Sequence, residues 1–556
     1  MSTHTNHSNG GTPHTADCAG GMHQGPAMLR DARSSKDTAF SQEERRALGL
    51  EGLLPTAVES LDQQVARALK HIDGKPNDLE RYIYLIGLEE RNETVFYKTV
   101  MSDPKRFIPI LYDPIVADAC EQFGEIYRRP RGMYINRHMK GRIADVLRNW
   151  PERDVRFICI STGGRILGLG DIGANGMGIP IGKLQLYTAC AAVPPRHLLP
   201  IMFDIGTTNT QLHKAPFYLG TREMPLSTEE LDELTDEFIH AVQQVFPGCC
   251  VHFEDWKGTD AIRMLERYKE KVLCYNDDIQ GTASVALAGI DAAMNITGGK
   301  LRDQRVLFLG AGSAGLGIAK LFCAELQAQG LSEEEARGHV ALFDINGLIT
   351  SARNDLTDMQ TLFAHGDQLC TDFVGFIRSF KPTILMGVST KAGAFNQQVI
   401  EAMSAINERP VIFALSNPTH KAECTAEQAY TWSKGKALYA AGVQFPEFTY
   451  QGHVHRPGQA NNFYIYPAIG LATYAARPRL LDDQAFIVAA HATAEQITTE
   501  QRDMGMLYPS QDQILETEVS TAVRICEYLF DSGLAQVKRP PNIRQWLNEQ
   551  LYKPHY

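Results

Sequence analysis

The sequence lacks any hydrophobic run long enough to cross a membrane, and it has no excess of basic residues. No apolar stretch reaches the ~18 residues that a transmembrane helix needs. The net charge of −11 argues against a nucleic-acid-binding surface, which needs clustered basic side chains. No charged segment followed by an apolar one opens the chain, so we expect no secretory signal. These absences favour a cytoplasmic protein with a small-molecule substrate and neither a membrane nor a nucleic-acid partner.

Paired cysteine motifs are also missing. None of the eleven cysteines forms a C-x-x-C pair, and several lie inside apolar runs, such as Cys159 in RFICIS and Cys274 in KVLCYN. Isolated cysteines in such runs are typical of buried, reduced thiols. We therefore expect a reducing compartment.

Most of the chain alternates between short apolar runs and helix-length segments. Four strand-like runs that end in polar residues lie between 155 and 276. A second unit, 277–462, holds five more, and this alternation predicts a doubly wound parallel sheet. The segment after Asn462 is helical in character, and we expect it to fold back onto the earlier unit. The five strands predicted in the second unit are 306–310, 340–344, 383–387, 411–415 and 437–441.

The predicted fold is α/β, with a helical N-terminal domain, a central α/β catalytic domain and a doubly wound, Rossmann-type NAD-binding domain. Within the helical domain, Pro55 to Lys70 and Asp78 to Leu88 have apolar residues at helical spacing. The predicted boundaries are a disordered tail at 1–38, the helical domain at 39–130, the catalytic domain at 131–276 with 463–535, the NAD-binding domain at 277–462 and an extension at 536–556.

The NAD-binding prediction depends on one of two G-x-G-x-x-G strings. The string at 310–315 follows the apolar strand RVLFL and leads into a helix-like run, GLGIAKLFCAEL. A dinucleotide needs that setting, because glycines let the backbone approach the pyrophosphate at a helix N-terminus. The string at 168–173 is followed by more glycine and by Pro180, so we expect no helix there and interpret it as a turn that carries substrate-facing groups. The predicted pyrophosphate contacts are Gly310, Gly312, Ser313, Ala314 and Gly315.

The next strand of this unit ends in an acid, Asp344. An aspartate at this place accepts hydrogen bonds from the ribose hydroxyls of NAD and repels the 2′-phosphate of NADP. Its distance from the glycine loop exceeds the usual ~20 residues, which the polar insertion LSEEEARGH explains. The nearest cation downstream is Arg353. The sequence therefore predicts NAD as the cofactor.

Four carboxylates stand at the ends of two predicted strands. Glu254 and Asp255 end the run CVHFED, and Asp277 and Asp278 end VLCYNDD. Acids placed in this way repel one another unless a cation lies between them. An all-oxygen ligand set favours Mg²⁺ or Mn²⁺ over Zn²⁺. The alternative is a pair of helix caps or a solvated acidic patch, which these dipeptides alone do not exclude.

Taken together, several runs resemble malic enzymes, from near Phe40 almost to the C-terminus. They occur in the family's order: RILGLGDIGANGMGIPIGKLQLYTA from Arg165, FEDW at 253–256, NDDIQGTASVALAG at 276–289, the GAGSAG loop, LSNPT at 415–419 and QANN at 459–462. The resemblance implies oxidative decarboxylation of malate to pyruvate and CO₂, with reduction of NAD and a bound Mn²⁺ or Mg²⁺. It also implies a homodimer or homotetramer.

The resemblance assigns roles to individual residues. Lys183 would be the general base, with Asp277 close to it, and Tyr112 the general acid. A lysine base must be uncharged near neutral pH, which requires partial desolvation beside a metal. The implied metal ligands are Glu254, Asp255 and Asp278. The implied substrate and cofactor contacts are Arg165, Asn417 and Asn462.

Without the resemblance, plainer interpretations of three of these residues hold. Lys183 would be a surface lysine on a helix, and Tyr112 a half-buried packing side chain. Asn417, in SNPT, would be a turn or cap residue.

Some segments depart from the malic enzyme pattern. Tyr112 to Ala117 reads YDPIVA where most malic enzymes read Y-T-P-T-V-G, and this version, with GVSTKAGAF at 387–395, resembles malolactic enzymes. Those convert malate to lactate and retain the NAD. Against that alternative, malolactic enzymes usually have glycine in place of Arg165 and lack the GMGIPIGK form. Besides a malic enzyme and a malolactic enzyme, a third hypothesis is a dinucleotide-binding protein without catalytic activity. Loss of Lys183 or of one of the acids that would bind the metal would have favoured it.

Two further arginines match positions where some relatives bind a dicarboxylate effector between subunits. They are Arg67 and Arg91. Surface arginines are more often merely solvated, so we treat this site as an open hypothesis.

Overall fold

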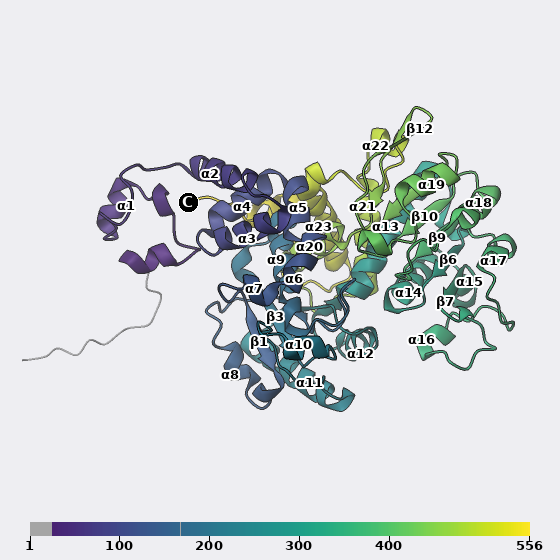
Figure 1. The fold of residues 1–556 in the computed structure, drawn as a ribbon, viewed down its shortest axis with the longest axis horizontal. Helices are drawn as coiled ribbons and strands as arrows, with labels where there is room; N and C mark the ends of the chain where they lie inside the picture. Colours follow the sequence, from purple (N-terminus) through teal and green to yellow (C-terminus); the bar gives the residue numbers. More distant parts are fainter. Residues whose placement is uncertain (1–24, 167) are drawn as a thin grey trace, which may run out of the picture.

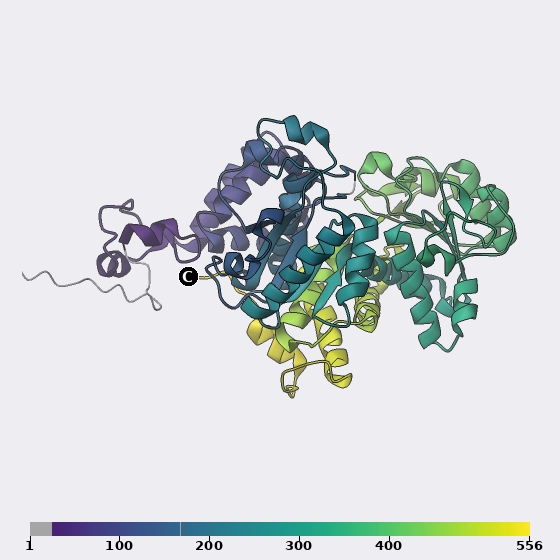
Figure 2. The same cartoon turned by 90° about the horizontal axis from the view of Figure 1, so that it is seen from below.

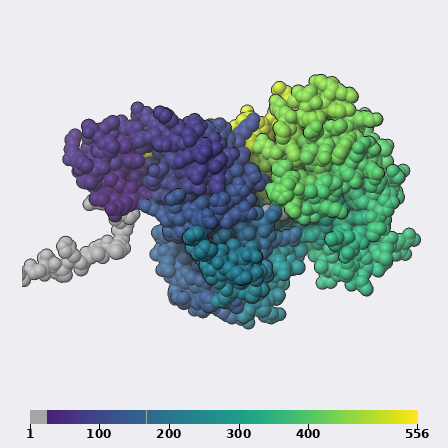
Figure 3. All heavy atoms as spheres, in the orientation of Figure 1, coloured from purple at the N-terminus to yellow at the C-terminus, as the bar shows by residue number. Residues whose placement is uncertain are grey.

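The computed structural model of the protein describes residues 25–166 and 168–556 (Figure 1). One lobe combines helices with a five-stranded sheet, and the other is built around a seven-stranded sheet. Figure 3 shows the two lobes side by side, the first purple to teal and the second green. The predicted α/β class, with an N-terminal helical region and a doubly wound sheet, is confirmed.

Helices make up the N-terminal region, and most begin behind a capping side chain. α2 starts directly after Ser60, whose hydroxyl accepts a hydrogen bond from the Gln63 backbone N–H while the Gln63 side chain caps in return. This capping box explains why the helix does not begin at Pro55, as the apolar spacing predicted. The helices are α1 (Gln42–Ala47), α2 (Leu61–Asp73), α3 (Asp78–Glu89), α4 (Glu93–Ser102), α5 (Pro104–Leu111), α6 (Ile115–Glu121) and α7 (Phe123–Ile126).

The segment predicted to be a disordered tail carries structure from Gly25 onward. It contains η1 (Gly25–Arg30) and η2 (Asp37–Ala39), and the buried Arg45 side chain donates hydrogen bonds to the Thr38 and Phe40 carbonyls. Residues 1–24, including His4, His7, His14 and His23, lie outside the described residues.

The first sheet is entirely parallel, in the order β1-β3-β2-β4-β5. Four of its strands were predicted; β1 was not, because it is short and buries only Ile135. The strands are β1 (Met133–Asn136), β2 (Phe157–Ser161), β3 (Leu198–Asp204), β4 (Cys250–Glu254) and β5 (Cys274–Asn276). The helices of this domain are α8 (Ile143–Leu147), α9 (Gly178–Ala191), α10 (Thr210–Lys214), α11 (Thr228–Val245) and α12 (Gly258–Tyr268).

The second sheet has the order β14-β11-β10-β9-β6-β7-β8, and only the β7–β8 pair is antiparallel. The chain reverses its winding between β6 and β9, which is where a doubly wound sheet opens a ligand crevice. All five predicted strands are present. The strands are β6 (Val306–Leu309), β7 (Val340–Asp344), β8 (Gly347–Leu348), β9 (Ile384–Gly387), β10 (Val411–Ala414), β11 (Leu438–Ala441) and β14 (Gly458–Gln459), with a separate hairpin of β12 (Phe448–Tyr450) and β13 (His453–His455).

Helices cover both faces of this sheet and lead out of it. α13 leads from the first sheet into the second, and α14 follows β6 directly. The helices are α13 (Thr282–Thr297), α14 (Ser313–Ala328), α15 (Glu333–Gly338), α16 (Asp358–Thr361), α17 (Phe373–Phe380), α18 (Gln397–Ile406) and α19 (Ala426–Trp432).

The C-terminal helices return to the first lobe, as expected. α20 packs on α9, and α21 packs on α13, so the yellow end of the chain lies against the teal and blue segments in Figure 2. These helices are α20 (Tyr466–Ala476), α21 (Asp483–Glu495), α22 (Thr499–Asp503), α23 (Ile514–Asp531) and α24 (Ile543–Gln550).

Nine of the ten cysteines that the structure describes are buried thiols. All ten of these are unpaired, and Cys370 alone among them is more than slightly accessible. Within the same residues, every helix is too short or too polar to traverse a bilayer.

The contact between α20 and α9 leaves no room for a side chain at Gly470. A Cβ there would overlap the ring of Tyr187, which is itself fully buried. We expect Gly470→Ala to lower the free energy of unfolding by about 1–3 kcal/mol through overpacking. The measurement is chemical denaturation followed by circular dichroism. Gly338→Ala is the control, since a Cβ at Gly338 meets no atom within 4 Å; equal effects of the two changes would contradict the packing argument.

Candidate active site

A cleft lies between the two lobes, where the carboxyl ends of strands from both sheets face each other. It encloses about 1000 Å³ including its open mouth. The first lobe contributes the ends of β4 and β5 with parts of α5, α6 and α9, and the second contributes the segments after β10 and β14. The predicted residues that line it are Tyr112, Lys183, Glu254, Asp255, Asp278, Asn417 and Asn462.

Strand register brings the four predicted acids together. β4 and β5 are paired so that Phe253 lies opposite Asn276, and the next residues along are therefore Glu254 and Asp277. Asp278 lies in the π-helical turn η6 (Asp277–Gly281) that follows β5. Its carboxylate accepts a hydrogen bond of 2.8 Å from the Asp255 N–H. Two strand ends thus bring the acids together at the carboxyl edge of the sheet.

Three of these acids form a group suited to a hard cation. One carboxylate oxygen from each of Glu254, Asp255 and Asp278 lies within 4.8 Å of the others. Burial raises the pKa of Glu254 to about 7, although Lys183 opposes the shift. Burial, reinforced by the neighbouring acids, raises the pKa values of Asp255 and Asp278 well above the usual range. A divalent cation would relieve this repulsion, so the donor set fits Mg²⁺ or Mn²⁺.

Lys183 is buried beside the same acids. It lies on α9, and only 1% of the residue is exposed. Its ammonium is paired with Asp277 and lies 3.0 Å from Glu254 Oε1. Burial alone would lower the lysine pKa, but Asp277 and Glu254 outweigh it and raise that pKa. The expected burial is therefore present, whereas the uncharged state is not favoured by these protein groups alone.

Aromatic rings surround the Lys183 ammonium. The Tyr112 ring centre is 5.3 Å away and the Tyr466 ring centre 4.4 Å away. Burial raises the Tyr112 pKa well above its usual value, with Lys183 opposing the shift. The Tyr112 phenol therefore keeps its proton across the neutral range.

Two asparagines approach this group from the second lobe. Asn462 donates from Nδ2 to Asp277 Oδ2 at 2.9 Å, which connects the β14 segment to the lysine pair. Asn417 lines the cleft, and its buried Oδ1 has no hydrogen-bond partner in the described chain. Such an atom is expected to be satisfied by a bound molecule.

Sequence reasoning missed two polar residues of the cleft. Asp113 lines it next to Tyr112, and burial raises the pKa of its carboxyl to about 6. Asn461 donates from Nδ2 to Asp113 Oδ2 at 3.4 Å. The signal was present in the sequence, since Asp113 is the first departure in YDPIVA, but nothing there showed that its side chain faces the site.

Arg165 is exposed and lies apart from this group. Its backbone N–H approaches the Asp255 carbonyl at 3.4 Å. Its guanidinium lies beside Gly258, next to the Ser313 hydroxyl of the nucleotide loop. The structure thus brings Arg165 to the cofactor side of the cleft and not among the buried acids.

The nucleotide loop has the predicted strand–turn–helix form. Gly310 follows β6 with φ +119°, and a Cβ there would strike the Val388 carbonyl. A Cβ at Gly315 would likewise strike the Gly310 carbonyl, whereas Gly312 faces open space. Helix α14 begins at Ser313, so its first N–H groups face that space. This geometry fits a pyrophosphate.

Asp344 ends β7 as predicted, and Arg353 reaches it. The guanidinium contacts both Asp344 oxygens at 2.8 and 2.7 Å, and it also binds Asp355 at 2.8 Å. The Arg353 side chain is only 6% exposed. The single positive charge of Arg353 therefore lies between two carboxylates, and the net charge at the end of β7 remains negative.

The first glycine string does precede a helix, which corrects the sequence-based expectation. The short η4 (Gly173–Met177) runs directly into α9, with Pro180 in its first turn. Proline is tolerated there because the first backbone N–H groups have no partner within the helix. Gly168 packs against Pro418, so the string touches the second lobe.

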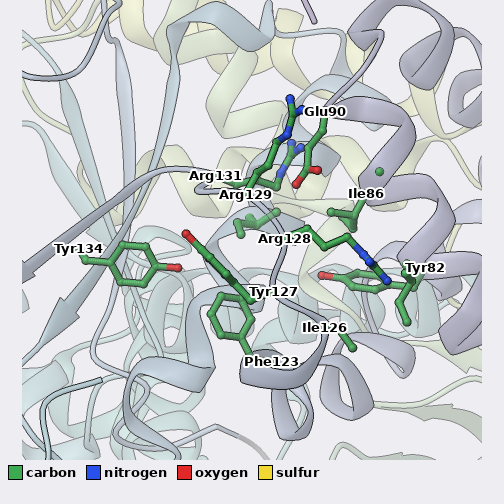
Figure 4. Close-up of a pocket in the computed structure, with 13 residues that line it drawn as sticks. Tyr82, Ile86, Glu90, Phe123, Ile126, Tyr127, Arg128, Arg129, Arg131 and Tyr134 are labelled. Atoms are coloured by element: carbon green, nitrogen blue, oxygen red, sulfur yellow. The ribbon is translucent and has the colours of Figure 1, made fainter. Parts of the chain in front are cut away.

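A second cavity lies away from these residues, beside α3 and the chain leading to β1 (Figure 4). Tyr82 lines it from α3 and Glu90 from the residue directly after that helix, with Tyr127 and Tyr134 on the opposite side. Three arginines close in sequence also line it: Arg128, Arg129 and Arg131.

The two arginines considered for an effector site have protein partners. Arg67 pairs with Glu59. Arg91 donates from Nε to the Gly87 carbonyl at 3.0 Å and stands over the Tyr84 ring.

Comparison with known proteins agrees with this architecture. A family model described as "Malic enzyme, N-terminal domain" matches residues 89–269, and one described as "Malic enzyme, NAD binding domain" matches residues 279–530. The NADP-dependent malic enzyme of Mus musculus is 44% identical over 536 residues, which cover 96% of this chain and 94% of that protein. The mitochondrial NAD-dependent malic enzyme of Ascaris suum is 42% identical, covering 95% and 83%.

Solved structures show the same fold. The crystal structure of Entamoeba histolytica malic enzyme has a TM-score of 0.57 at 19% identity, covering 91% of this chain and 92% of that one. Malic enzyme from Pyrococcus horikoshii has a TM-score of 0.54 at 22% identity, covering 80% and 88%. By its family-model matches and its identity to these relatives over nearly its whole length, the chain belongs to the malic enzyme family.

Proposed function

We propose that the protein oxidises and decarboxylates malate to pyruvate and CO₂, with NAD as the hydride acceptor. The observation that carries this proposal is the buried Lys183–Asp277 pair beside three acids, in a cleft next to a dinucleotide-type sheet. A lysine beside a cation site at a nucleotide cleft suits removal of a hydroxyl proton during hydride transfer.

Lys183 acts as the general base on the C2 hydroxyl of malate. Asp277 holds the amine from one side. A divalent cation beside Glu254 would offset the acids that keep the amine protonated, so that the amine could accept the hydroxyl proton. Asn462 binds the same Asp277 oxygen and keeps it directed at the amine. A base of this kind contributes when its geometry is set before substrate arrives.

Glu254, Asp255 and Asp278 would hold the Mn²⁺ or Mg²⁺ ion. Such an ion would supply polarisation of the C2 oxygen of malate and stabilisation of the negative charge that develops as CO₂ leaves. Asn417, whose buried Oδ1 has no partner within residues 25–166 and 168–556, would contact the bound substrate or nicotinamide group.

Tyr112 acts as the general acid. Its phenol keeps its proton because burial raises its pKa, and it lies beside Lys183 at the cleft wall. It protonates C3 of the enolate that remains after CO₂ has left. Arg165, whose guanidinium lies beside Gly258 near the Ser313 hydroxyl, would bind an anionic group there.

We expect Asp278→Asn to lower turnover by about 100-fold or more, because it removes one anionic ligand from a site that stabilises charge. The amide oxygen can still accept the Asp255 N–H, so folding should be retained. Removing one of three mutually repelling acids should leave the melting temperature of the metal-free protein unchanged or higher. We would measure steady-state rates in Mn²⁺, with chelator controls, together with thermal melts. Near-normal activity would refute this ligand assignment.

Variants of the base and the acid should damage different partial reactions. Lys183→Arg keeps the charge beside Asp277 but does not release a proton near neutral pH, so hydride transfer from malate should fall by about 10²–10⁴-fold. Lys183→Ala should also lose this step. Because it leaves buried acids unpaired, it should lower the free energy of unfolding by about 3–5 kcal/mol.

Tyr112→Phe should instead lose mainly the protonation of the enolate. The two steps can be measured separately by giving the enzyme oxaloacetate, to follow its decarboxylation, or pyruvate as an alternative substrate. Equal damage by the lysine and tyrosine variants to every partial reaction would contradict the separate roles, and with them this mechanism.

NAD should be preferred over NADP by about tenfold or more in kcat/KM, because a 2′-phosphate would meet an acidic strand end. Relatives of both cofactor types match the chain, so the choice depends on these residues. Arg353 is in reach of the ribose site, but Asp344 and Asp355 both bind it. Asp344→Ala removes one of the two acids that bind Arg353, so the strand end loses its net negative charge and the preference should fall by about tenfold. Wild-type kcat/KM for NADP at or above that for NAD would overturn the prediction.

A further inference from the structure

A buried histidine lies directly behind the metal-side acid Glu254. His252 is in β4, is 0% exposed, and precedes Glu254 by two residues, so both side chains leave the same face of the strand. Its Nε2 lies 2.8 Å from Glu254 Oε2. Its Nδ1 lies 3.0 Å from the hydroxyls of both Tyr187 and Tyr275, which are hydrogen-bonded to each other.

The chemistry of the partners determines the direction of these hydrogen bonds. A neutral imidazole has one N–H, and an ionised Glu254 carboxylate only accepts, so the proton is on Nε2. Nδ1 then accepts one hydroxyl proton. Because Nδ1 has a single lone pair, one of Tyr187 and Tyr275 donates to it and the other donates to its neighbour's oxygen. The order is therefore tyrosine to tyrosine to histidine to Glu254.

This series of hydrogen bonds gives the two oxygens of Glu254 different partners. Oε2 is held by His252 on the closed side, while Oε1 lies 3.0 Å from Lys183 Nζ on the cleft side. Rotation of the carboxylate would break the bond to His252 and leave a buried N–H without a partner, which is costly. The carboxylate therefore presents one defined oxygen to the site.

We propose that His252 is a positioning residue that, anchored by Tyr187 and Tyr275, fixes the Glu254 carboxylate for metal binding. The proposal rests on the metal-ligand role given to Glu254 under the proposed function. Groups that orient metal ligands in this way commonly change metal affinity by about 10–100-fold. The neighbouring ligands Asp255 and Asp278 have no such histidine in the contacts described, so the effect should act through Glu254.

The test measures Mn²⁺ binding directly, from the spin-resonance signal of free Mn²⁺ during titration of the full-length protein. His252→Leu should raise the Mn²⁺ Kd by about 10–100-fold, because it releases Glu254. His252→Gln should restore affinity to within about threefold, since its amide both donates to Glu254 and accepts from a tyrosine. NAD affinity, followed by fluorescence titration, should stay the same in both.

A second set of variants leaves the imidazole in place. Tyr187→Phe or Tyr275→Phe alone should change the Kd little, because the remaining hydroxyl still donates to Nδ1. The double variant removes the anchor and should raise the Kd several-fold, about the lower end of the same range. This set decides the matter if His252→Leu does not fold.

Three outcomes would overturn the proposal: an unchanged Mn²⁺ Kd in folded His252→Leu, no rescue by His252→Gln, or equal losses of Mn²⁺ and NAD affinity. Glu254→Gln separates this failure from that of the proposed function. If Glu254→Gln binds Mn²⁺ normally, the ligand assignment itself is wrong. If it binds weakly while His252→Leu binds normally, only the positioning role fails.

Discussion

The interaction on which the site depends is the ion pair between buried Lys183 and Asp277. A lysine with 1% exposure is costly to bury, and it is stable here because Asp277 and Glu254 compensate its charge. Without a positive charge such as the Lys183 ammonium beside them, the same acids would repel one another. Lysine and acids therefore stabilise each other, and the lysine amine lies 3.0 Å from an acid of the group that could bind a cation.

The rest of the fold brings these groups together from distant parts of the chain. Parallel strands place Glu254 and Asp277 at one sheet edge, and α9 carries Lys183 to the same edge. The returning C-terminal helix α20 packs on α9, and Asn462, just before it, binds Asp277. This C-terminal segment therefore helps to hold Asp277, the ion-pair partner of Lys183, in its position.

Sequence patterns predicted the elements better than the contacts. Continuous apolar runs and strand-end acids identified both sheets, since strand ends in parallel sheets meet at one edge. The burial of Lys183 could not be predicted from the sequence, because all of α9 is buried and its residues show no apolar face. Arg353 lies nine residues from Asp344 in sequence, yet the turn through β8 brings it back onto the acid. The contacts of His252 could not be predicted either, because Tyr187 and Tyr275 lie 65 and 23 residues away on other elements.

We propose that malate is oxidised and decarboxylated at this one site, and product analysis tests that proposal most directly. The protein is incubated with malate, NAD and Mn²⁺, and pyruvate, lactate and NADH are each quantified. Equal amounts of pyruvate and NADH, without lactate, are the predicted result. Lactate formed with no net NADH would contradict this proposal and favour the malolactic alternative; the YDPIVA segment resembles malolactic enzymes, and its Asp113 lines the cleft.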